Sequence, residues 1–373
     1  MYSGFLVLTL LWWPGDVPEK TAPTAQALIA RHEKTKSPVW VDGDTATFFY
    51  RGDAEQVLLM IGGEEKQLQR LPDSDVWTTT VTRKGMAQGV FTYMLMPGKK
   101  GASVYTVGKS FRPQAWRGPE APPAPAKAVI LTGTLKIVDF ASKALGETRA
   151  IKVYLPPGHD KSKSYPVIYA TDGNDAAHLL EALITSGKVP PLVVIAASSG
   201  AYQGDRTKAY ESKKDLRALE YLAGIDADRY RKHATFFCEE LPAWAEKEFG
   251  ASRERKDRAV LGCSNGGRFA VDIGIQRPDL YGHVFAFSVA GRREIKLPEK
   301  TDKLPYFHLA AGTWETGFHK TTTNVAEALK QQGVAHTFIS RVAGHDFSMW
   351  EDELVAAAVR AFGSAKKADA EKK

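Results

Sequence analysis

Residues 258–267 read RAVLGCSNGG, and this stretch decides the fold class of the larger part of the chain. A strand is expected over 258–261, and a helix is expected after the turn, ending near Arg277. The G-x-S-x-G order from Gly262 to Gly266 places small residues around Ser264, so the backbone can turn sharply and expose the hydroxyl. Ser264 is therefore the candidate nucleophile. The alternative is a tight glycine-rich turn without a chemical role.

A serine hydroxyl is a weak nucleophile and needs a base that is itself oriented by an acid. The partners of such a serine follow it in the order acid, then histidine, each after a later strand. His345 fits this order, because it lies between a strand expected over 336–342 and a helical run over 349–362. His308 falls inside a strand expected over 306–311 and should be a core or sheet-face histidine. His345 is the candidate base, and a loop histidine that caps the last helix is the alternative.

The acid is expected between Ser264 and His345, at the end of a strand. Glu315 closes the segment Gly312-Thr313-Trp314-Glu315, directly after the strand expected over 306–311. Asp346 adjoins the histidine and cannot easily reach across its ring, but it could anchor the loop. Glu315 is the candidate acid, and a solvent-facing carboxylate is the alternative.

Acyl transfer also needs backbone donors for the oxyanion, and each is worth about 2.7–4 kcal/mol of transition-state stabilisation. The Asn265 amide, directly after the nucleophile, is the first candidate donor. The second is the Asn174 amide, in the loop Thr171-Asp172-Gly173-Asn174-Asp175 that follows an early strand. Gly173 would let the backbone approach a substrate closely. An ordinary Asp-Gly turn is the alternative.

Two kinds of pattern divide the chain. Short β-rich runs separated by turn residues predict a small β-sandwich at 37–116, and four prolines between 117 and 127 predict an extended linker. Over 128–364, apolar β-rich runs alternate with helical stretches, which indicates a mostly parallel sheet covered on both faces, an α/β fold. Residues 1–36 form an N-terminal segment and residues 365–373 a charged tail.

Composition limits the classes of function. The formal net charge is +7, part of it from the terminal tail, and no basic block alternates with aromatics, so nucleic acid is a poor candidate partner. Two cysteines cannot build a four-thiolate zinc site or a disulfide framework. The apolar run 5–13 is too short to span a membrane. A signal remnant is the less favoured interpretation of that run, so both a cytoplasmic and a periplasmic or secreted location stay open.

Several separated motifs resemble the putative-esterase family of α/β-hydrolases, especially the branch of enterobactin esterases. The resemblance covers roughly 136–362 and rests on the segments TDGND (171–175), RALEYL (217–222), AVLGCSNGG (259–267), AAGTWE (310–315) and AGHDFSMW (343–350). It implies Ser264, Glu315 and His345 as a catalytic triad, with the Asn174 and Asn265 amides as oxyanion hole. The early β-sandwich resembles the immunoglobulin-like domain that many of these enzymes carry.

Four residues are candidate substrate contacts: Asp172, Gly173, Arg217 and Arg268. We interpret Arg217 and Glu220 as a structural pair, with direct substrate contact by Arg217 as the alternative. Arg268, together with Arg292 and Arg293, would supply positive charge to an anionic substrate, although solvated surface arginines are the more ordinary interpretation. Siderophore esterases tend to have an aromatic residue close behind the Asp-Gly of the first loop, where this chain has 174–177 NDAA.

The sequence thus predicts a serine ester hydrolase that acts on a small or oligomeric ester, like the siderophore esterases. No P-loop, H-E-x-x-H or dinucleotide motif implies a metal or an organic cofactor. A feruloyl or acetyl esterase stays open, with Trp40, Trp77 and Trp116 as a sugar platform, although core packing explains the first two more simply. An acyltransferase is a further alternative. A non-enzymatic binding protein is the least favoured, and the oligomeric state stays open.

Overall fold

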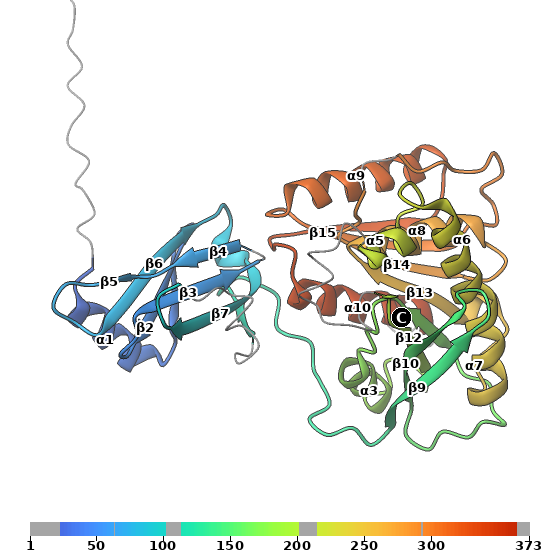
Figure 1. Ribbon diagram of the computed structural model, residues 1–373, viewed down its shortest axis with the longest axis horizontal. Helices are drawn as coiled ribbons and strands as arrows, with labels where there is room; N and C mark the ends of the chain where they lie inside the picture. The colour runs from blue at the N-terminus through green and yellow to red at the C-terminus, as the bar shows by residue number, and fades with distance from the viewer. Residues whose placement is uncertain (1–22, 63, 102–112, 201–214, 292–293, 364–373) are drawn as a thin grey trace, which may run out of the picture.

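The computed structural model of the chain describes residues 23–62, 64–101, 113–200, 215–291 and 294–363. A β-sandwich of two four-stranded sheets precedes an α/β part built on one eight-stranded sheet (Figure 1). The segment 5–13, Arg292, Arg293 and the tail 365–373, all of which entered the sequence predictions, lie outside the described residues.

The sandwich pairs a sheet of order β1-β2-β6-β5 with a sheet of order β4-β3-β7-β8. Its strands are β1 (Val39–Asp42), β2 (Thr45–Arg51), β3 (Gln56–Ile61), β4 (Glu64–Gln67), β5 (Gln69–Arg70), β6 (Val76–Thr82), β7 (Val90–Gly98) and β8 (Gln114–Arg117). Phe48 and Phe91 are fully buried between the two sheets, with their ring centroids 6.2 Å apart. Trp40 and Trp77 are each 5% exposed, so both belong to the core and neither serves as a sugar platform.

The α/β part contains a sheet of order β16-β15-β14-β13-β11-β12-β10-β9. Neighbouring strands from β12 to β16 pair in parallel, whereas β9 and β10 are antiparallel. The strands are β9 (Thr134–Ser142), β10 (Glu147–Leu155), β11 (Val167–Ala170), β12 (Val193–Ala197), β13 (Arg258–Cys263), β14 (His283–Phe287), β15 (Tyr306–Gly312) and β16 (His336–Arg341). Together with its flanking helices this is the predicted α/β-hydrolase fold.

Helices cover both faces of this sheet, because successive strand residues point to opposite sides. Tyr169 faces one core and its neighbour Ile168 faces the other. The first face is covered by α6 (Ala227–Thr235), the π-helical segment η4 (Phe236–Glu240), α7 (Leu241–Phe249), α8 (Asn265–Gln276) and α9 (Thr316–Gln331). The second face is covered by α3 (Ala177–Thr185) and α10 (Phe347–Phe362). The short α5 (Leu216–Tyr221) places Tyr221 in the first core.

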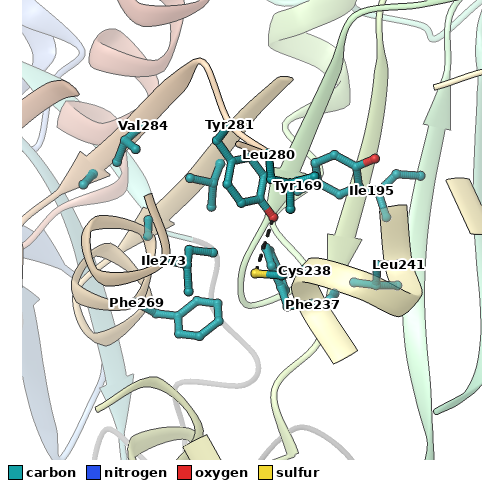
Figure 2. Close-up of a cluster of buried hydrophobic side chains, with 14 of the residues drawn as sticks. Tyr169, Ile195, Phe237, Cys238, Leu241, Phe269, Ile273, Leu280, Tyr281 and Val284 are labelled. Atoms are coloured by element: carbon teal, nitrogen blue, oxygen red, sulfur yellow. Dashed lines mark hydrogen bonds between the residues drawn. The ribbon is translucent and has the colours of Figure 1, made fainter. Parts of the chain in front are cut away.

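Figure 2 shows part of the first core, where Tyr281 points its hydroxyl at Cys238. The Tyr281 oxygen and the Cys238 sulfur are 3.9 Å apart, and Phe237 and Phe269 pack beside them (Figure 2). Burial raises the pKa of Cys238 to about 12, so this cysteine stays a neutral thiol and packs as a small apolar residue.

Some elements differ from the sequence predictions. The strand β9 at the sheet edge was not predicted, since its residues up to Ile137 are exposed and give no buried apolar run. The helix α1 (Ala25–Thr35) was also not predicted; it buries Leu28 against the sandwich residues Trp40 and Phe49. Strand β8 includes Arg117, which the sequence pattern assigned to the linker.

None of the helices within the described ranges is both long enough and apolar enough to cross a bilayer.

Candidate active site

The turn between β13 and α8 carries Ser264 in a strained backbone conformation. Ser264 has φ 60° and ψ −124°, outside the regions that ordinary residues favour. The turn closes only because its neighbours are glycines. A Cβ on Gly262 would lie 2.0 Å from the carbonyl oxygen of Gly266, and one on Gly266 would lie 2.2 Å from Thr171 Oγ1. The strain is thus localised at the candidate nucleophile, as expected of a functional turn.

Backbone hydrogen bonds fix Ser264 from both sides. Its N–H donates to the carbonyl of Phe287 at 2.9 Å, and its own carbonyl accepts from Arg268 N and Ala290 N, each at 3.1 Å. Its side chain is half-buried and makes no hydrogen bond to another described residue. The hydroxyl is therefore held in place by the main chain and left free for chemistry.

His345 and Glu315 contact each other directly. His345 Nδ1 lies 2.6 Å from Glu315 Oε2. The Glu315 side chain is 3% exposed and the His345 side chain 27% exposed, so the acid is buried while the imidazole reaches solvent. The ring of Phe318 packs over the imidazole at 4.2 Å between centroids, and Trp350 meets it edge-on at 4.9 Å. This packing fixes the plane of the imidazole ring.

Two donors fix the other carboxylate oxygen of Glu315. Ser288 Oγ donates to Glu315 Oε1 at 2.6 Å, and Gly312 N donates to the same oxygen at 2.7 Å. Trp350 Nε1 donates in turn to Ser288 Oγ at 2.8 Å. A buried carboxylate that accepts this many hydrogen bonds is a rigid partner for the imidazole.

All three candidate groups lie at the carboxyl ends of the parallel strands, because they follow β13, β15 and β16. The end of β14 bridges them, since Phe287 accepts from Ser264 N and Ser288 donates to Glu315. Among the described residues, no hydrogen bond joins Ser264 Oγ to His345. That bond is often long before substrate binds to a hydrolase.

The two predicted oxyanion donors differ in the unliganded structure. The Asn265 N–H makes no hydrogen bond to another described residue and is available at the start of α8. The Asn174 N–H donates to the carbonyl of Thr171 at 3.1 Å. The amide of Gly173 is also used, by the carbonyl of Ala197 at 2.9 Å. Asn174 would therefore have to share or exchange its turn hydrogen bond to stabilise an oxyanion.

Asp172 and Arg217 bind each other. Arg217 Nε donates to Asp172 Oδ1 at 2.6 Å, and Nη2 donates to Oδ2 at 2.8 Å. Arg217 Nη2 also approaches the carbonyl of Cys263 at 3.4 Å, next to the nucleophile. The pair thus links the loop before α3 to the turn before α8, through a bidentate geometry that favours rigidity.

The predicted pair of Arg217 and Glu220 is wrong. Glu220 is fully buried and instead binds Arg149, with Nη1 to Oε2 at 3.2 Å, and Arg229, with Nε to Oε1 at 3.0 Å. Burial acts to raise the pKa of Glu220, but the hydrogen bond from Arg149 and the nearby positive charges hold it below its ordinary value. The partners of Glu220 come from strand β10 and helix α6, so its own helix holds neither of them.

Arg268 lies one helical turn after the nucleophile and is 8% exposed. Its Nε lies 2.9 Å from Asp272 Oδ1, and the two side chains border a cavity of about 210 Å³ beside Gly291. Burial raises the pKa of Asp272, and the charge of Arg268 opposes that shift. The structure therefore places Arg268 near the nucleophile, but as the partner of a carboxylate.

Cys263 and Asn174 border a small cavity of about 60 Å³, which Phe287 and Trp350 close from the second core. Burial raises the pKa of Cys263 well above its ordinary value, so this neighbour of Ser264 stays a neutral thiol. It packs as an apolar residue under the turn.

Sequence reasoning missed Ser288 and Trp350 as partners of the acid. Ser288 is fully buried and has a φ of 50°, a sign of a special turn that only coordinates reveal. The one available signal was its place directly after a strand, since candidate residues of hydrolases lie at strand ends. Within the described residues, no group of three or more His, Cys, Asp or Glu is arranged to bind a metal ion.

Comparisons with known proteins show that the chain is similar to esterases. The family model described as Putative esterase matches residues 142–316. A curated relative, the endo-1,4-beta-xylanase/feruloyl esterase of Xylanibacter ruminicola, is 26% identical over 239 residues, which are 58% of this chain and 30% of the relative. The chain therefore spans less than a third of the length of that relative.

Solved structures share the fold. The ferric enterobactin esterase from Salmonella typhimurium superposes with a TM-score of 0.68 and 17% identity, covering 89% of this chain and 98% of that one. A ferulic acid esterase superposes with a TM-score of 0.51 and 20% identity, covering 62% of this chain and 98% of that one. The first alignment extends over both the sandwich and the α/β part, because the α/β part alone is too short for such coverage.

Proposed function

We propose that the chain is a serine carboxylic-ester hydrolase with Ser264, His345 and Glu315 as its catalytic triad, and the match of residues 142–316 to the family model described as Putative esterase supports this proposal. One observation carries the proposal: the 2.6 Å contact of His345 Nδ1 with a buried carboxylate, at the sheet edge that also carries the strained Ser264. An oriented imidazole and a serine hydroxyl without another hydrogen-bond partner, at the same ends of the parallel strands, are what nucleophilic acyl transfer requires.

The proposed reaction has two halves. His345 Nε2 accepts the proton of Ser264 as the serine oxygen attacks the ester carbonyl, while Glu315 stabilises the imidazolium. The amides of Asn265 and Asn174 donate to the oxyanion. The tetrahedral intermediate collapses to an acyl-enzyme, and the alcohol leaves with the proton from His345. Water then repeats the sequence and releases the acid.

We propose a siderophore ester as the substrate class, as in the enterobactin esterases. The support is architectural: the Salmonella enterobactin esterase aligns with the sandwich as well as the sheet, whereas the ferulic acid esterase aligns with a smaller share of the chain. A feruloyl ester is the second candidate, because the curated relative in the sequence comparison is named a xylanase/feruloyl esterase.

The first test compares wild type with Ser264→Ala on short p-nitrophenyl esters. Removal of the nucleophile should lower kcat by about 10⁴-fold or more, and labelling by a fluorophosphonate probe should disappear. The matched control is Ser162→Ala, which makes the same change at an exposed serine. Unchanged hydrolysis by Ser264→Ala would refute the proposed triad.

A second measurement assigns the substrate. Wild-type kcat/KM is compared for a triscatecholate lactone siderophore, methyl ferulate and an acetylated sugar. A preference of at least about 10-fold for the lactone, worth about 1.4 kcal/mol of transition-state binding, would support the siderophore assignment. A preference of that size for methyl ferulate would replace it with the feruloyl assignment.

A further inference from the structure

The β-sandwich contacts the loop that carries His345. Val90 N, at the start of β7, donates to the carbonyl of Val342 at 3.0 Å, and Val90 pairs with Ala343 in a parallel bridge. Two residues further along β7, Thr92 donates through both its N–H, at 2.5 Å, and its hydroxyl to Asp346 Oδ2. Strand β7 therefore binds the main chain before His345 and the side chain directly after it.

The same part of the sandwich contacts the loop that carries Glu315. Trp314 Nε1 donates to the carbonyl of Lys84 at 3.0 Å, and its ring packs 6.2 Å from the ring of Phe91. The fit is tight, since a Cβ on Gly89 would lie 2.5 Å from Trp314 Cη2. The residue next to the candidate acid is thus fixed by the sandwich as well.

The two loops are also joined to each other, because Trp314 N donates to the carbonyl of Ala343 at 2.9 Å. A displacement of one loop would therefore move the other. Figure 1 shows the start of α10 on the side of the α/β part that faces the sandwich.

Asp346 is the central residue of this contact. It is 1% exposed, and its Oδ1 accepts from Ser348 N at 2.8 Å, which caps the N-terminus of α10. Its Oδ2 accepts both hydrogen bonds from Thr92. A buried carboxylate is costly unless it is fully hydrogen-bonded. Oδ1 thus binds the N-terminus of α10, and Oδ2 binds strand β7 of the sandwich.

From these contacts we infer that Thr92 and Asp346 are positioning residues of the esterase reaction: the sandwich fixes the base and acid loops against Ser264, and the α/β part alone lacks a complete site. The inference rests on the proposed roles of His345 and Glu315. Neither Thr92 nor Asp346 touches the reacting atoms in this scheme; each acts through the loop that carries His345.

The decisive variant is Asp346→Asn in the full chain. Asparagine caps helices as well as aspartate does, so its oxygen can keep the bond from Ser348. Its amide group cannot accept from the Thr92 N–H, so the backbone hydrogen bond to β7 is lost. A small shift of the imidazole lowers the chemical rate without removing substrate contacts. We expect kcat to fall about 10- to 100-fold, with KM changed less than about 3-fold.

Two substitutions of Thr92 test the same hydrogen bonds to Asp346 from the sandwich. Thr92→Val removes the hydroxyl and keeps the shape, whereas Thr92→Ser keeps the hydroxyl. Thr92→Val should lower kcat and Thr92→Ser should restore it to within about twofold of wild type. In the double variant with Asp346→Asn, the Thr92→Val effect should vanish, because both changes break one link.

The matched control is Asp352→Asn. Asp352 binds Arg117 of the sandwich, with Oδ1 and Nη2 2.6 Å apart, and it belongs to α10 rather than to either loop. This variant breaks an equally direct contact between sandwich and α/β part, and kcat should stay within about twofold of wild type. Thermal unfolding of every variant confirms that the chain is folded at the assay temperature.

These variants distinguish a failure of the positioning role of Thr92 and Asp346 from a failure of the proposed esterase function. If Ser264→Ala is inactive while folded Asp346→Asn keeps the kcat of wild type, the positioning role is refuted and the triad stands. Equal losses in Asp346→Asn and Asp352→Asn would also refute it, since they would indicate general loosening of the interface. Activity in Ser264→Ala would overturn the proposed function itself.

Discussion

At the residue scale, the site depends on side chains buried beneath the reacting groups. Ser288 receives a hydrogen bond from Trp350 and donates one to Glu315, so a single hydroxyl connects a helix to the acid. This order fixes the hydroxyl proton toward the carboxylate, because the indole N–H can only donate. The carboxylate that binds His345 is thus held in place by buried residues from two other elements.

A second buried residue, His233, predicts how stability depends on pH. It is fully buried, and neither ring nitrogen has a hydrogen-bond partner among the described residues. It packs against the rings of Tyr221 and Phe269. Burial lowers the pKa of His233 to about 4, because the charged imidazolium is excluded from the apolar core.

A lowered pKa in the folded state means that the unfolded chain binds the proton first as pH falls. His233 should therefore cost no stability above about pH 6.5, and should lower the free energy of unfolding by up to about 3 kcal/mol as pH falls toward 4. His233→Phe should flatten this dependence. Urea unfolding at about pH 7 and about pH 5 checks it.

The control is His233→Gln, which is equally unable to titrate in this range but leaves polar groups in the core. Both variants should show a weaker pH dependence than wild type, and only His233→Gln should be less stable at neutral pH, by about 1–3 kcal/mol. A wild-type slope retained in both variants would refute the role of His233.

At the element scale, the strand-turn-helix unit of β13 and α8 is the part of the fold that the sequence predicts best. The expected strand at 258–261 and the expected helix end near Arg277 match β13 and α8 closely. The reason is local: the glycines around Ser264 and the proline after Arg277 act through short-range sterics. The other strands expected in the α/β part also match, because parallel strands buried on both faces read as continuous apolar runs.

Other features depend on contacts distant in sequence and were not predictable. The partner of Arg217 is Asp172, from a loop 45 residues away, rather than Glu220 three residues away. The turn hydrogen bond that occupies Asn174 is likewise a matter of loop geometry. Edge strand β9 has mostly exposed side chains, so its sequence carries no core signal. The roles assigned to Ser264, His345, Glu315 and the two amides stay predictions until kinetics tests them.

Two glycine substitutions test the local argument. Gly262→Ala should lower the free energy of unfolding by about 3 kcal/mol or more, because the new Cβ meets the carbonyl of Gly266 at 2.0 Å and neither backbone segment can move aside. Chemical denaturation of purified protein measures the change. Failure to accumulate as soluble protein would agree with it.

The matched control is Gly317→Ala, within α9. Nothing lies within 4 Å of the Cβ position there, so alanine should stabilise the helix by about 0.5–1 kcal/mol. If both substitutions change stability by the same amount, the steric account of the turn at Gly262 is incorrect.

At the scale of the whole molecule, the side chain of Trp314 connects the α/β part to the core of the sandwich. Trp314 follows β15 of the α/β part, yet it packs against the core of the sandwich with Phe91. The sandwich and the α/β part should therefore unfold together. The proposed domain bounds, 37–116 and 128–364, thus describe two domains that are joined by this contact.

We expect calorimetry of the wild type to show one transition, and Trp314→Ala to separate it into two. The loss of packing should cost roughly 1–3 kcal/mol. The matched control is Trp244→Ala, since Trp244 packs only within the α/β part, against Phe249 and Phe140. It should lower the transition temperature without splitting the transition. Two transitions in wild type would show that the contact does not couple the two parts.

The hydrogen bonds from Thr92 to Asp346 span 254 residues of sequence. A growing chain leaves the ribosome with its N-terminal part first, and such parts fold as units before the rest is made. Strand β7 is then already in a folded sheet when the loop with His345, which is made later, becomes available to dock. The site would thus be completed only once the loop with His345 docks, on a template that strand β7 of the sandwich provides.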